Sequence, residues 1–174
     1  MRSALCSLRY ALCAWRLHKE DMKICQYLTP DLIVPDLKAL NKEGVLSELA
    51  DRIAGHVSGL EAEEVLQVLL DRERLGSTGI GEGFAIPHGK LKTLAQMIIA
   101  FGRSIQGISF DSLDGKTAHY FFVLIAPEDS AGLHLKALAK ISRFLKNSTF
   151  KEGLSRASDR EALHKVIQEQ DDLP

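Results

Sequence analysis

The run from His119 to Ala126 constrains the fold more than any other part of the chain, because it is apolar at nearly every position. Successive side chains of a strand point to opposite faces of a sheet, so a strand of this kind is buried on both faces. A second apolar, β-rich run, from Met97 to Phe101, also has the length of a strand. The sequence therefore predicts a sheet with a covered central strand.

Four other segments repeat apolar residues at three- and four-residue steps, the spacing of one helix face. Asn41 suits an N-cap, acidic residues open the second segment, and a capping box opens the last. The predicted helices run from Asn41 to about Ala54, from about Glu61 to Gly76, from Ser130 to about Lys146, and from Ser158 toward the C-terminus. Without a linker or an internal repeat, this order of strands and helices predicts one α/β domain from about residue 22 to 170.

Charge and cysteine usage exclude several functions. The chain has 22 Lys and Arg against 23 Asp and Glu, so no overall positive field attracts nucleic acid or an anionic membrane. Its uncharged runs fall short of the roughly 18 apolar residues that a spanning helix needs. The three cysteines, all within the first 25 residues, are too few for a disulfide framework and favour a reducing compartment. We therefore expect a cytoplasmic protein with no nucleic-acid partner and no membrane insertion.

Residues 1–21 form a leader that differs from the rest of the chain. It carries four basic residues among apolar ones and has no acidic residue before Glu20. An organellar targeting peptide has this basic, acid-poor and amphipathic character. The simpler interpretation is that Met22 starts the functional domain, and that the leader is a non-native upstream start or a flexible, loosely held segment.

The stretch from Gly76 to Gly89 reads GSTGIGEGFAIPHG and is too rich in glycine for a regular element. It predicts an ordered loop or a short strand with tight turns, whose exposed N–H groups can cradle an anion. Its spacing matches neither the Walker phosphate loop nor the dinucleotide fingerprint, so ATP and NAD are not supported. Pro87 fixes the backbone before His88, which favours a defined direction for the imidazole.

Residues 76–91, GSTGIGEGFAIPHGKL, resemble the phosphorylation-site motif of the phosphotransferase-system (PTS) enzyme IIA type-2 family, which has mannitol, fructose and nitrogen-regulatory members. The resemblance extends to residues 70–74, to Phe121–Pro127, and to His134 with Leu135. It implies a single α/β domain with a mixed β-sheet flanked by helices on both faces. It also implies a protein without a metal ion, nucleotide or other cofactor.

By this resemblance, His88 accepts a phosphoryl group, as a tele-phosphohistidine, from a small histidine phosphocarrier protein (HPr or its nitrogen-system counterpart NPr) in a phosphoenolpyruvate-dependent relay. The family places an arginine sixteen residues before the histidine, and a second histidine beside it. These positions are Arg72 and His134 here. The protein is therefore expected to be a phosphotransferase component.

The physical chemistry of the residues agrees with these roles. Phosphoryl transfer needs positioned donors, which Arg72 and the amides and hydroxyls near Ser77 and Thr78 can supply, and Gly79 belongs to the same predicted phosphate-binding loop. A neutral imidazole is a competent nucleophile near pH 7. His134 falls in the first turn of a predicted helix, where the helix dipole favours an anion. A carboxylate would repel phosphate, so Glu82 is expected to point away or to pair with a basic residue.

Alternatives remain open at the level of sequence. The short chain favours a stand-alone nitrogen-regulatory protein that signals to target proteins, over a fructose- or mannitol-specific component that passes phosphate to a IIB domain. A metal-dependent hydrolase built on His88, His119 and His134 is a rival of another class, although it lacks an acidic cluster. A third possibility is an interaction module whose loop binds a partner without chemistry.

Overall fold

The structure is a computed structural model that describes residues 22–173. Residues 1–21 lie outside this range, so the two interpretations of the leader stay predictions. The elements are η1 (Ile24–Gln26), η2 (Pro30–Leu32), β1 (Ile33–Val34), α2 (Lys42–Ala54), α3 (Ala62–Arg74), β2 (Gly79–Gly81), β3 (Phe84–Ala85), β4 (His88–Leu91), β5 (Ile98–Ile108), β6 (Ala118–Pro127), α4 (Ala131–Phe144), α5 (Ser148–Arg156) and α6 (Arg160–Asp172).

Strand β6 is the centre of a six-stranded mixed sheet. It pairs antiparallel with β5 on one edge, and parallel with the short strands β3 and β4, one after the other, on its other edge. The parallel pairing of β1 with β5 and the antiparallel pairing of β2 with β3 extend the sheet to either side. The side chains from Phe121 to Ala126 are fully buried, which confirms the predicted central strand.

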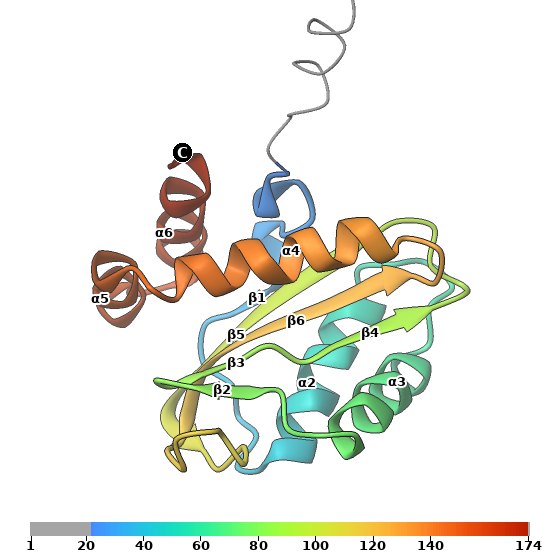
Figure 1. The fold of residues 1–174 in the computed structure, drawn as a ribbon, viewed down its shortest axis with the longest axis horizontal. Coiled ribbons are helices and arrows are strands. Elements are labelled where there is room, and N and C mark those ends of the chain that lie inside the picture. Colours follow the sequence, from blue (N-terminus) through green and yellow to red (C-terminus); the bar gives the residue numbers. More distant parts are fainter. Residues whose placement is uncertain (1–21, 174) are drawn as a thin grey trace, which may run out of the picture.

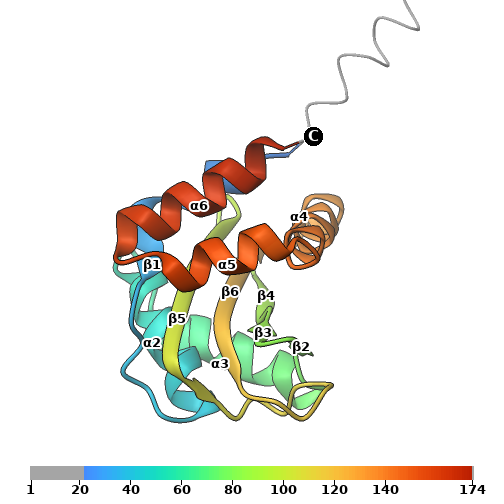
Figure 2. The same ribbon diagram turned by 90° about the vertical axis from the view of Figure 1, so that its left-hand side faces the viewer.

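Helices cover both faces of the sheet, as the resemblance implied. Helices α2 and α3 pack on one face, while α4, α5 and α6 lie on the other (Figures 1 and 2). The buried aliphatic side chains of α2 and α3 and the aromatic side chains of β5 and β6 belong to one hydrophobic core. Within residues 22–173, no helix combines the length and the apolar character needed to cross a membrane.

The predicted helices are present, and local capping explains where they begin. The Asn41 side chain accepts a hydrogen bond from the Gly44 amide at 2.8 Å and caps α2. At the C-terminal helix α6, the capping side chain is Asp159 rather than Ser158, because its Oδ1 accepts from the Ala162 amide at 2.8 Å.

Several elements were not predicted. Helix α5 begins directly after α4, where Asn147 accepts hydrogen bonds from two amides and starts a new helix. Strand β5 continues well beyond Phe101, to Ile108. The glycine-rich stretch, expected to be an ordered loop or a short strand with tight turns, contains β2, β3 and the start of β4, and His88 is the first residue of β4.

Candidate functional site

The position of His88 is set by the sheet and by a close helix contact. His88 pairs with Leu124 of the central strand, so its backbone is fixed in the core. The next residue is Gly89, where an added Cβ would lie 2.2 Å from Val68 Cγ1 of α3. Only glycine lets α3 pack this closely, and the packing brings the last turn of α3, with Arg72, to His88.

Both ring nitrogens of His88 have hydrogen-bond partners, which define its tautomer. Nδ1 lies 2.7 Å from the Ile86 carbonyl oxygen, which only accepts, so Nδ1 carries the proton. Arg72 Nε donates to Nε2 at 3.1 Å, so Nε2 presents its lone pair. Burial, with the nearby Arg72 charge, lowers the pKa of His88 below its ordinary value. His88 is therefore neutral near pH 7, with Nε2 as its nucleophilic atom.

Arg72 reaches this nitrogen from the last turn of α3. Its Nη1 donates to the Gly76 carbonyl at 2.9 Å, which anchors one edge of the guanidinium. Arginine has five N–H donors, and these two hydrogen bonds use two of them. The planar group is thus held beside His88 with donors left for the oxygens of an anion.

His134 approaches His88 from α4, on the opposite face of the sheet from α3. The two ring centroids are 5.4 Å apart, with an interplanar angle of 71°. The His134 side chain is buried, and its Nδ1 has no hydrogen-bond partner among the described residues. Burial is the main cause that lowers the pKa of His134 to about 4, and repulsion from a protonated His88 and from Lys90 adds to it. The second imidazole is therefore neutral and has an unused hydrogen-bonding nitrogen.

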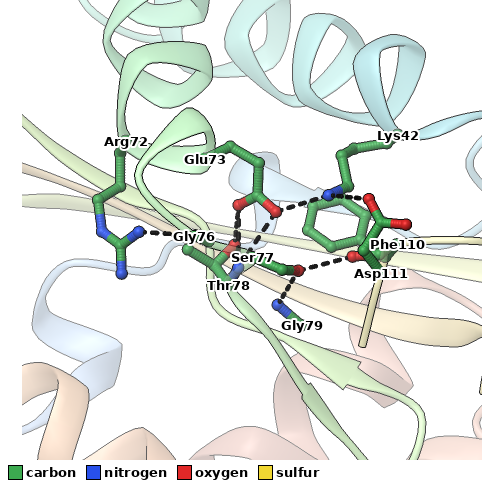
Figure 3. Close-up of polar contacts among 9 residues, drawn as sticks. All are labelled: Lys42, Arg72, Glu73, Gly76, Ser77, Thr78, Gly79, Phe110 and Asp111. Atoms are coloured by element: carbon green, nitrogen blue, oxygen red, sulfur yellow. Dashed lines mark hydrogen bonds and ion pairs between the residues drawn. The ribbon is translucent and has the colours of Figure 1, made fainter. Parts of the chain in front are cut away.

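The polar groups of the glycine-rich stretch bind within the protein. Thr78 donates to Glu73 through its amide and its hydroxyl, while the Ser77 hydroxyl donates to the Phe110 carbonyl at 2.7 Å (Figure 3). The Gly79 amide donates to the Ser77 hydroxyl at 3.1 Å. Acceptors of the protein itself engage these donors here, and their role toward a phosphate stays a prediction.

The structure shows that Glu73, which sequence reasoning missed, lies beside the site. Glu73 follows Arg72, and its carboxylate accepts hydrogen bonds from Thr78 and Lys42 (Figure 3). In the sequence Asp71-Arg72-Glu73-Arg74, this glutamate resembles an exposed helix charge. The only sequence signal was its place within the segment that resembles the family motif.

Glu82 and His119 lie outside this site. The Glu82 carboxylate forms an ion pair with Lys151 of α5, which confirms the expected basic partner. His119 Nδ1 lies 3.0 Å from the Ser104 carbonyl. In the part of the chain that the structure describes, no three His, Cys, Asp or Glu side chains gather into a possible metal site. The centre that the metal-hydrolase alternative requires is not formed.

The fold and the paired histidines beside an arginine place the chain in a known class. The family described as "Phosphoenolpyruvate-dependent sugar phosphotransferase system, EIIA 2" matches residues 26–170. The chain therefore belongs to the PTS enzyme IIA type-2 family, as its glycine-rich motif indicated.

Within the family, the chain is similar to nitrogen-regulatory and sugar-specific proteins. A nitrogen regulatory protein of Bradyrhizobium diazoefficiens is 40% identical, covering 84% of this chain and 95% of that relative. The PTS fructose-specific EIIABC component of Bacillus subtilis is 36% identical, covering 86% of this chain but 24% of that relative. The crystal structure of the nitrogen regulatory protein IIA-Ntr from Neisseria meningitidis superposes with a TM-score of 0.78 at 33% identity, covering 83% of this chain and 98% of that chain.

Proposed function

We propose that this chain is a phosphoryl carrier whose acceptor atom is Nε2 of His88, with a histidine phosphocarrier protein (HPr or NPr) as the donor. One observation carries the proposal: the Ile86 carbonyl holds the proton on Nδ1, so the lone pair of Nε2 faces Arg72. Because the chain belongs to a phosphotransferase family, the reaction that we assign to this nucleophile is phosphoryl transfer. The proposal places the exchange in the cytoplasm, where phosphoenolpyruvate supplies such relays.

The transfer needs no metal ion and no proton transfer at His88. The Nε2 lone pair attacks the phosphorus of the donor phosphohistidine, and the donor's N–P bond breaks as its imidazole recovers the electron pair. His88 keeps its proton on Nδ1 and gains positive charge on the ring. The Ile86 carbonyl, 2.7 Å from Nδ1, stabilises that charge.

Arg72 and His134 bind the phosphoryl oxygens in this proposal. When Nε2 forms its bond to phosphorus, Arg72 Nε loses its acceptor and donates to a phosphoryl oxygen beside it, while Gly76 still anchors Nη1. His134 is neutral and buried, and it offers one N–H to an oxygen. The N-terminal turn of α4 adds a favourable field for the anion.

The test is phosphorylation with phosphoenolpyruvate, enzyme I and the histidine phosphocarrier protein. The wild-type chain should gain one acid-labile phosphate, and His88→Ala should gain none. His56→Ala removes an exposed imidazole outside the site and serves as the matched control. Full labelling of His88→Ala, or a phosphate mapped to residue 134, would overturn the assignment.

For the biological role, we favour nitrogen regulation, in which the phosphorylation state is signalled to target proteins. The Bradyrhizobium nitrogen regulatory protein is 40% identical to this chain and the fructose-specific component is 36% identical, which supports this choice. The alternative is a sugar-specific component that passes phosphate to a IIB domain. Rapid transfer from phosphorylated His88 to a fructose or mannitol IIB domain would favour that alternative, while its absence would favour regulation.

A further inference from the structure

A second cluster of charges lies directly beside Arg72. The Glu73 carboxylate, whose side chain is 6% exposed, accepts from Lys42 Nζ at 2.8 Å and from the Thr78 hydroxyl at 2.6 Å. Lys42 also pairs with Asp111 at 2.8 Å, and its ammonium lies 4.7 Å from the centre of the Phe110 ring. We name Lys42, Glu73, Thr78 and Asp111 the Glu73 clamp (Figure 3).

The clamp closes the turn that supports the Arg72 side chain. Arg72 binds the Gly76 carbonyl, and Glu73 binds Thr78, two residues further along. Two adjacent residues of α3 thus hold the segment that leads into β2. Gly76 turns the chain there with φ +147°, a conformation that other residues rarely adopt. Without the Glu73 carboxylate, this segment would lose its hydrogen bonds at Thr78 and would rest on the backbone hydrogen bond from the Gly76 amide to the Glu73 carbonyl.

Glu73 also acts on the site through its charge. Burial alone would raise the pKa of Glu73, but hydrogen bonds from Lys42 and Thr78 outweigh it, so the pKa is lowered and the group stays ionised. Its negative charge raises the pKa of His88, against the effects of burial and Arg72. The same charge would repel a phosphoryl group on Nε2. Lys42 is the cation in direct contact with Glu73, and it offsets much of that repulsion.

We propose that Glu73 is a positioning residue for transfer at His88, and that Lys42 shields the phosphoryl group from the Glu73 charge. Glu73 fixes the turn on which Arg72 rests, so that the guanidinium is ready before the donor arrives. Lys42 compensates the negative charge of Glu73, and the Glu73 carboxylate still accepts the hydrogen bonds from Thr78. The proposal rests on the proposed function of His88.

The charged and titratable groups that influence the His88 ring come from two helices. Arg72 and Glu73 act from α3, and His134 lies against the ring from α4. Since only Glu73 among them is acidic, its charge and that of Lys42 are expected to move the pKa of His88 in opposite directions. Glu73→Gln should lower this pKa, and Lys42→Met should raise it. A structural defect alone would not produce opposite shifts.

The experiment measures both the pKa of His88 and the kinetics of transfer. Imidazole NMR titration of the unphosphorylated protein gives the pKa, and single-turnover assays with varied donor give the rate and the apparent affinity. Glu73→Gln should slow transfer about tenfold, the effect of one lost charge-assisted hydrogen bond, with little change in donor affinity. Lys42→Met should also slow transfer. Glu152→Gln, which removes a carboxylate from an exposed ion pair on α5, should match wild type.

A milder variant keeps the test decisive if Glu73→Gln does not fold. Thr78→Val removes only the hydroxyl that binds Glu73, so transfer should slow while the His88 pKa stays near the wild-type value. Wild-type kinetics in Glu73→Gln and Thr78→Val, or His88 pKa shifts of the same sign in Glu73→Gln and Lys42→Met, would overturn the proposal. If the wild-type chain takes no phosphate on His88, the proposed function fails, whereas the titration still reports on the clamp.

Discussion

The two sides of the site differ in how completely their polar groups are bonded. On the α3 side, Arg72 makes two hydrogen bonds and Glu73 binds both Thr78 and Lys42. On the α4 side, His134 Nδ1 is buried and has no partner among the described residues. Leaving such an atom unbonded costs about 1–3 kcal/mol. The hydrogen bonds of the α3 side are therefore already formed in the unphosphorylated protein, whereas the α4 side has a nitrogen that forms none with the described residues.

This difference assigns the two sides different parts of the reaction. A preorganised donor lowers the barrier because it needs no rearrangement when charge develops. An unsatisfied group gains most when the new ligand is in place. We therefore expect changes on the α3 side to act chiefly on the rate of transfer, and changes on the α4 side to act on the rate and on the lifetime of the phosphorylated state.

The largest expected effect is at Arg72. Arg72→Ala removes the donors closest to Nε2 and should slow transfer about a hundredfold or more, the loss typical of a donor to developing charge. Arg72→Lys keeps the charge but not the planar fork, so its rate should lie between those of wild type and Arg72→Ala. Rapid-quench assays measure both rates.

A neighbouring arginine supplies the control for this prediction. Arg74, on the same turn, is 69% exposed and pairs with Asp71. Arg74→Ala should transfer phosphate at the wild-type rate with a similar thermal midpoint. If Arg72→Ala and Arg72→Lys also matched wild type, the α3 side would have no role in transfer, and the comparison would fail.

The next effect is at His134, on the α4 side. His134→Ala removes one N–H donor to the phosphoryl group, so transfer should slow roughly ten- to a hundredfold, with phosphate still on His88. The phosphorylated variant should also lose its phosphate faster. His134→Gln retains a donor and should recover part of both properties. If His134→Ala had the wild-type transfer rate and the wild-type lifetime of the phosphorylated state, His134 would contribute only to packing on the α4 side.

Much of the fold follows from patterns that the sequence displays. The apolar run of β6 identifies a strand covered on both faces, and Asn41 marks the start of α2. The short strands β2, β3 and β4 have no such pattern, because turns and pairing with β6 define them. Helix α5 was missed because Asn147 begins it with almost no break after α4.

The site could be predicted only in part, for a different physical reason. The family resemblance identified His88, Arg72 and His134, and the structure brings these three together. The resemblance and the small side chains of Ser77 and Thr78 gave no information about competing acceptors. Glu73 takes the Thr78 donors because the helix turns its carboxylate inward, against a lysine 31 residues earlier in the chain. Such long-range pairing cannot be read from local sequence.

The smallest expected effect concerns stability at low pH, and it again separates the two sides. His134 has a folded-state pKa of about 4, while a histidine in an unfolded chain titrates near 6.5. The unfolded chain therefore binds more protons at this site between these values, and stability is lost as pH falls from about 6.5 toward 4. At pH 5 the loss is about 2 kcal/mol, and at pH 7 it is close to zero. His134→Gln should lack this component, so urea unfolding at pH 5 and pH 7 should show a smaller difference in the variant than in wild type. Equal differences would mean that His134 titrates normally, and that burial on the α4 side does not lower its pKa.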